Sequence, residues 1–152
     1  MSGLKNGTWV LVADGEKALF LENKTDAEDP YLEVWREEEQ ENPPNREQAA
    51  NRRGRVQQSA NHGKSAYEDT DWHKLSKERF ADDLADILYK HAHKNNFEHI
   101  VLCASPMILG ELRDKLHQEV TDRVVAEVDK TLTNHPVEDI EKILKTELDA
   151  AA

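Results

Sequence analysis

A cluster of basic residues near the middle of the chain is the strongest candidate for a functional site. Between residues 42 and 64 the sequence has five arginine or lysine residues and one glutamate, a formal charge of +4. The whole chain carries −11, so the remaining residues carry −15. Basic side chains bind phosphate groups, and such contacts weaken as salt rises. The residues that we expect to contact an anionic partner are Arg52, Arg53, Arg55, Gln57, Gln58, His62 and Lys64.

The segment that carries this cluster has the composition of a loop. Residues 41–70 include an Asn-Pro-Pro-Asn stretch, Gly54 and Gly63, and few apolar side chains. Loops of this length are uncommon in compact domains unless they are functional or disordered. We therefore expect a long, flexible, basic loop at about 41–70, within a single domain that spans residues 1–152. The alternative is a solvated surface loop whose charge only offsets an acidic body.

Three short strands are predicted before the loop. Residues 8–13 are apolar and rich in β-forming side chains, and Asp14-Gly15 is typical of a hairpin turn because glycine supplies a positive φ. Residues 18–21 then form the returning strand, and residues 31–35 form a third. This part of the chain is expected to be an antiparallel meander.

Helices and strands are predicted to alternate after the loop. A helix should begin between Asp71 and Ser76 and end near Asn95, because several side chains follow helical spacing there. Those side chains are Phe80, Leu84, Ile87, Leu88 and His91. Residues 100–104 are continuously apolar, which is typical of a strand covered on both faces.

A second helix should follow this strand at once, since Ser105 and Pro106 supply an N-cap and a first-turn proline. Residues 124–128 form the next strand, parallel to the previous one through a right-handed crossover. A last helix begins at His135-Pro136, and its inward side chains are Val137, Ile140, Ile143, Leu144 and Leu148. The order β-β-β-loop-α-β-α-β-α predicts an α/β fold with a mixed sheet.

Other residues that could do chemistry have simpler explanations. Asp14 and Asp129 follow strands, as the carboxylates of a two-metal nuclease do, but a turn and an exit to solvent explain them. Cys103 lies in an apolar strand and is expected in the core. The histidines form no His-Glu-x-x-His motif, and His91 and His93 are two apart, a poor pair on a helix. We expect no metal ion and no cofactor.

The amino-acid sequence indicates the cellular compartment in which the protein is expected. One cysteine allows no intramolecular disulfide, no run approaches 18 apolar residues, and the first residues have no apolar core of a signal peptide. These features predict a cytoplasmic protein without a membrane partner. Trp9 and Trp35 are expected in the sheet core, and Trp72 at the junction of loop and helix, where it closes the loop over the core.

Four blocks of the sequence resemble the bacterial host-attachment protein family. Gly54-Arg55-Val56 with Ser59 and residues 64–68 resembles its "GR-F-S…RSAMEP" stretch, and residues 79–81 match its "ERFA" helix start. Residues 101–113 resemble its "LVLVAPPRFLGELR" unit, and residues 124–133 its "VVAELDKDLT" strand. The resemblance covers nearly the whole chain in order.

The resemblance implies a ribonuclease-H-like mixed sheet, similar to the middle domain of archaeal and eukaryotic peptide-chain release factors. In those factors the loop before the long helix carries Gly-Gly-Gln, which enters the peptidyl-transferase centre of the ribosome. The loop expected here contains Gln57-Gln58 and His62-Gly63-Lys64 but no Gly-Gly-Gln. Peptidyl-tRNA hydrolysis by that mechanism is therefore not expected.

Together these observations predict a non-enzymatic binding domain that resembles host-attachment proteins. Its basic loop would engage an anionic macromolecule, in the first place the ribosome or its RNA. A second hypothesis is a protein-interaction or regulatory domain that affects host attachment indirectly, through an acidic helix face around Asp82, Asp83 and Asp86. A hydrolase is the third. The oligomeric state is not predicted.

Overall fold

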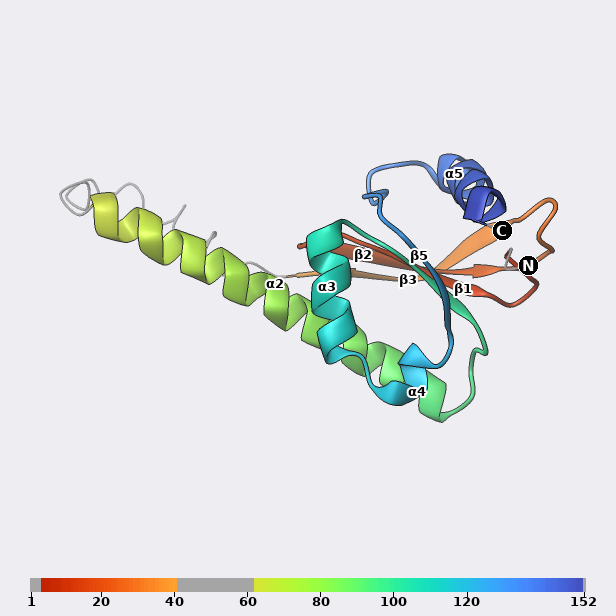
Figure 1. Cartoon of the computed structure of the whole chain (residues 1–152), viewed down its shortest axis with the longest axis horizontal. Coiled ribbons are helices and arrows are strands. Elements are labelled where there is room, and N and C mark those ends of the chain that lie inside the picture. The colour runs from red at the N-terminus through yellow and green to blue at the C-terminus, as the bar shows by residue number, and fades with distance from the viewer. Residues whose placement is uncertain (1–3, 41–61, 152) are drawn as a thin grey trace.

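The computed structural model describes the backbone of residues 4–40 and 62–151, and the side chains of residues 4–40 and 74–150. The described residues form one sheet in the order β3-β2-β1-β4-β5 (Figure 1). Its strands are β1 (Trp9–Ala13), β2 (Lys17–Asn23), β3 (Leu32–Glu39), β4 (Ile100–Cys103) and β5 (Val124–Val128). β1, β2 and β3 pair antiparallel, whereas β4 pairs parallel with both β1 and β5. The mixed sheet and the N-terminal meander are therefore confirmed.

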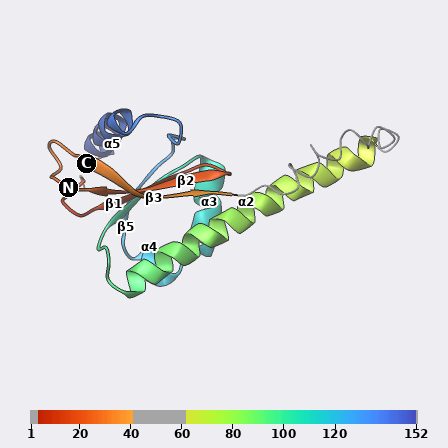
Figure 2. The same ribbon diagram turned by 180° about the vertical axis from the view of Figure 1, so that it is seen from behind.

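Alternation along the strands gives the sheet two buried faces. In β1 the side chains of Trp9 and Leu11 enter one apolar core, and those of Val10 and Val12 enter the other. Helices α2 (His62–His93), α3 (Pro106–Lys115) and α4 (Gln118–Thr121) cover the first face. Helix α5 (Val137–Ala151) covers the second with Ile140, Leu144 and Leu148. Figure 2 shows the strands lying between α2 and α5.

Helix α2 is much longer than its packed part. Its 32 residues span about 48 Å at 1.5 Å per residue. Its described buried side chains begin at Phe80, and they are Phe80, Ala81, Leu84, Ala85, Leu88 and Ala92. The N-terminal half of the helix extends away from the sheet (Figures 1 and 2). We call residues 62–76 the arm.

The expected start of this helix, between Asp71 and Ser76, was wrong. Helix α2 begins at His62, so residues 62–70 of the expected loop are helical. Helical spacing of apolar residues reveals a helix only where one face packs against something. The arm has no such face toward the sheet, and its sequence therefore carried no periodic signal.

Most other boundaries follow the predictions. Ser105 caps α3, and Pro106 is its first residue. Helix α5 begins directly after Pro136. Strand β3 continues to Glu39, beyond its expected end at residue 35, since it is an edge strand and charged side chains are common there. Helix α4, of four residues, was not predicted.

Among the described helices, none has the length and apolar character that a membrane crossing requires.

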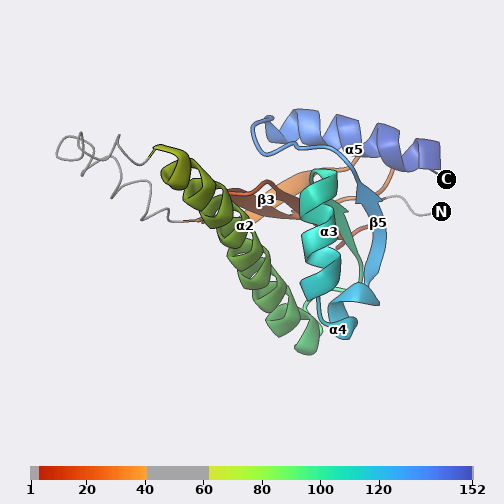
Figure 3. The ribbon, with the colours of Figure 1, turned by 60° about the vertical axis from the view of Figure 1, so that its left-hand side comes forward.

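Figure 3 shows α3 and α4 side by side with the sheet-bound half of α2.

Candidate functional site

Two of the seven predicted contact residues lie at the free end of α2. His62 and Lys64 lie in its first turn. Arg52, Arg53, Arg55, Gln57 and Gln58 lie outside the described residues. The first turn of α2 is therefore the point where the basic segment joins the described part of the chain. It lies at the end of the arm farthest from the sheet (Figure 1).

The base of the arm is held by Lys77 at the edge where β1 and β4 end. The Lys77 side chain passes over the β1–β2 turn, so that a Cβ on Gly15 would lie 3.2 Å from both Lys77 Cγ and Lys77 Cε. Lys77 Nζ lies 3.9 Å from the sulfur of Met107 in the first turn of α3. One turn further, Phe80 is buried in the core. These contacts set the direction in which the arm leaves the body.

The body beside this helix is strongly acidic. The pKa of the Asp83 carboxyl is raised, first by burial and then by the neighbouring charges of Asp82, Glu38 and Asp86. Lysine side chains pair with two of these carboxylates: Asp82 Oδ1 lies 3.7 Å from Lys115 Nζ, and Asp86 Oδ2 lies 3.2 Å from Lys90 Nζ. This face therefore repels phosphate groups.

Asp14 is a structural carboxylate. Its Oδ1 accepts hydrogen bonds from the backbone N–H groups of Glu16 and Lys17, each at 2.7 Å. Its Oδ2 accepts a 2.6 Å hydrogen bond from the hydroxyl of Thr133, which is buried. The turn interpretation is confirmed, and Asp129 is exposed as expected. Among the described side chains of residues 4–40 and 74–150, no three His, Cys, Asp or Glu side chains are placed to hold a metal ion.

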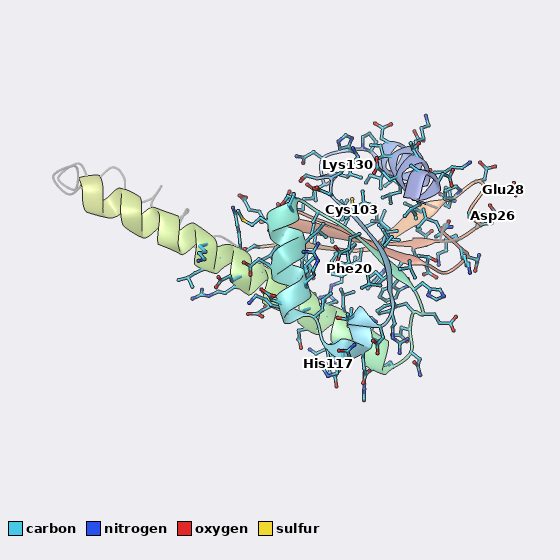
Figure 4. All side chains as sticks on the ribbon, viewed as in Figure 1. Phe20, Asp26, Glu28, Cys103, His117 and Lys130 are labelled. Atoms are coloured by element: carbon cyan, nitrogen blue, oxygen red, sulfur yellow. The ribbon has the colours of Figure 1, made fainter. Side chains whose placement is uncertain are left out.

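Cys103 and Ser105 are also structural. Cys103 is 1% exposed, and burial is the main cause that raises the pKa of its thiol to about 12. The thiol donates to the carbonyl of Lys130 at 3.3 Å, from within the sheet (Figure 4). A thiol with such a pKa is not a nucleophile at neutral pH. The Ser105 hydroxyl accepts from the backbone N–H of Ile108, as an N-cap does.

An aromatic cluster closes the core near the C-terminal end of α2. The Trp9 and Trp35 rings lie 4.5 Å apart, and both contact the His91 ring edge-on. Trp9 is buried and Trp35 partly buried, so both pack in the core as predicted. The pKa of His91 is lowered, first by burial and then by Arg36 and Lys94. Trp72 lies within α2 rather than at a junction, and its side chain is outside the described set.

A polar cavity at this same end of α2 was missed by the sequence reasoning. It has a volume of about 430 Å³, and its walls include Asn6, Glu22, Asn95, Glu98, His99 and Arg123. These residues come from segments that are far apart in the sequence and form no motif. Only the tertiary fold brings them together.

Comparisons with known proteins give a family and a distant structural likeness. A model of the family described as bacterial archaeo-eukaryotic release factor family 12 matches residues 7–144. The crystal structure of an archaeal translation termination factor, aRF1, is similar at a TM-score of 0.46 and 10% sequence identity. That alignment covers 95% of this chain and 38% of the factor, so this chain spans well under half of its length. No curated protein matches the sequence.

Proposed function

The chain belongs to the bacterial archaeo-eukaryotic release factor family 12, and on this basis we propose that it is a translation-related domain that binds ribosomal RNA. The observation that carries the proposal is the arm of α2. It places the start of the helix, and with it the end of the basic segment, away from the sheet (Figures 1 and 2). A binding segment presented in this way can enter a recess that the body cannot.

The length of the arm separates its free end from the acidic face of the body around Asp83. From Phe80 to His62 the helix rises by about 27 Å. The Debye length at physiological ionic strength is about 8 Å. The acidic side chains around Asp83 are therefore screened from the far end of the arm. The basic segment, residues 42–64, ends in the first turn of α2 and carries +4, so we propose that it attracts phosphates although the chain as a whole carries −11.

Binding without hydrolysis is the simplest role for this segment. The sequence contains no Gly-Gly-Gln, and His62-Gly63-Lys64 stands in the first turn of α2. A pair of glycines allows a backbone to approach a reaction centre more closely than a His-Gly pair does. The residues that we propose for phosphate contacts are Arg52, Arg53 and Arg55, with Gln57, Gln58, His62 and Lys64 in support.

Co-sedimentation with ribosomes at low and moderate salt tests the proposal. We expect binding that weakens as salt rises and that is lost when Arg52, Arg53 and Arg55 are all changed to Ala. The matched control changes Lys5, Lys94 and Lys142 to Ala, which removes the same charge from exposed sites on the body. Equal loss in both variants would mean that net charge, not the basic segment, drives the association. Binding that the arginine variant retains in full would refute the proposal.

A second candidate function rests on the acidic face of α2. The pKa of Asp83 is raised first by burial and then by the charges of Asp82, Glu38 and Asp86. Such a surface suits a basic protein partner, and a role in host attachment would then be indirect. A pull-down that survives the triple arginine change but fails when Asp82 and Asp86 become Lys would favour this function. The opposite pattern would favour RNA binding.

A further inference from the structure

The backbone at the C-terminal end of α2, which lines the cavity, is held by hydrogen bonds. The helix ends in a Schellman motif, in which the N–H of Asn96 bonds to the carbonyl of His91 and the N–H of Asn95 bonds to that of Ala92, both at 2.9 Å. Asn95 adopts a φ of 58°, a left-handed conformation that asparagine tolerates better than most residues. The backbone of Asn95 therefore has a defined conformation in the cavity wall.

Arg123 is fixed against the same wall. Its Nη1 donates to the carbonyl of Phe97 at 2.6 Å, its Nη2 to Oδ1 of Asn95 at 3.1 Å, and its Nε to the carbonyl of Glu119 at 3.0 Å. Its guanidinium lies 5.7 Å from the centre of the Phe97 ring. All three acceptors are neutral, and two of the five guanidinium N–H groups remain without a partner in the described part of the chain.

The charged groups of the cavity wall are not paired with one another. Within the described residues, no carboxylate lies in ion-pair distance of the Arg123 guanidinium, and Glu98 has no basic partner. Glu22 pairs outside this set with Lys24, whose Nζ lies 3.2 Å from Oε1 of Glu22 and 3.8 Å from Oε1 of Glu33. One fixed positive charge and one free negative charge therefore share a polar cavity of about 430 Å³. That volume is within the usual range for small-molecule sites.

We infer that this cavity binds a small zwitterion of the class of free α-amino acids. The ligand carboxylate would accept hydrogen bonds from Arg123 and from the Asn95 amide N–H₂ group, whose oxygen is already used by Arg123. The ligand ammonium group would pair with the Glu98 carboxylate. An anion alone would be repelled by Glu98, and a cation alone by Arg123, so the site prefers a molecule that carries both charges. The inference does not depend on the proposed function, because the cavity lies at the opposite end of α2 from the basic segment.

Titration of the full chain with L-alanine, followed by amide NMR shifts and calorimetry, tests the inference. We expect saturable shifts at Asn95, Glu98 and His99. N-acetyl-L-alanine, which keeps the carboxylate and loses the ammonium charge, should bind about tenfold more weakly or worse. The Glu98→Gln variant should lose a similar factor for L-alanine, and it should bind acetate at least as tightly as the wild type does, because the carboxylate that repels an anion is gone. Glu98 is exposed, so this variant is expected to fold.

The matched control is Glu138→Gln, an exposed carboxylate on α5, which should leave L-alanine binding unchanged. An Arg123→Lys variant should weaken L-alanine and acetate alike, provided that its amide spectrum stays native. The inference is overturned if L-alanine causes no saturable shift. It is also overturned if N-acetyl-L-alanine or inorganic phosphate binds as tightly as L-alanine, or if Glu98→Gln binds L-alanine like the wild type.

Discussion

A Thr70→Pro substitution should separate residues 62–69 of the arm from the rest of α2. Proline removes one backbone hydrogen bond and clashes with the carbonyl four residues earlier, at a cost of about 3 kcal/mol inside a helix. The helix can restart with proline in its first turn, so residues 70–93 keep their structure. The eight residues from 62 to 69 are left alone. Isolated helices shorter than about 12 residues are marginal in water, so about 12 Å of rigid arm is lost.

Three measurements follow the Thr70→Pro variant. Far-UV circular dichroism should show the loss of about eight helical residues. The thermal midpoint of the body should stay the same, because the described buried side chains of α2 begin at Phe80, ten residues further along the helix. Ribosome co-sedimentation should fall toward that of the triple arginine variant. Thr70→Ala, which favours the helix, should leave all three unchanged.

Two results would refute the reasoning. If Thr70→Pro sediments with ribosomes like the wild type at both salt concentrations, a rigid arm is not what presents the basic segment. If the thermal midpoint falls by several degrees, the arm contributes to the stability of the body.

The remaining predictions concern the body. Thr133→Val should lower the free energy of unfolding by about 2 kcal/mol in urea titration, because it removes a hydrogen bond to the Asp14 carboxylate; a loss below about 0.5 kcal/mol would contradict the structural role of that carboxylate. Cys103 should resist iodoacetamide at pH 8 in the native state, since the pKa of its buried thiol is about 12; rapid labelling would show that it is accessible. The folded-state pKa of His91 is lowered, so the unfolded chain binds more protons, and the free energy of unfolding should fall as the pH drops below about 6.5. His91→Gln should reduce that dependence, and an unchanged slope would assign it to other groups.

The sequence predicted those parts of the fold that bury a repeating face or use a specific turn. The apolar run of β4, the cap at Ser105 and the hairpin turn at Asp14 each leave a local pattern, and each was found where the pattern placed it. The packed half of α2 was found for the same reason. The arm of α2 was not, because it extends away from the sheet and its sequence has no apolar periodicity that predicts a helix.

The two candidate sites differ in how clearly the sequence predicts them. A run of basic residues stands out by composition, and it pointed to the segment before α2. The cavity beside Arg123 has no such signal, because its walls come from the N-terminus, β2, the turn after α2 and the start of β5. In the sequence, each of these residues taken alone is indistinguishable from an ordinary surface residue.

The central position of β1 has a consequence for how the chain folds. β1 pairs with β2 through a tight turn, but its other neighbour is β4, where Trp9 faces Ile100 across 91 residues of chain. The meander can therefore form as soon as residue 39 has been synthesised, whereas the parallel pair must wait for the closure of a long loop. Until then one edge of β1 stays unpaired and both apolar faces of the meander stay uncovered. We expect the docking of β4 to be the slow step of folding, and the nascent chain to be most prone to aggregation before it.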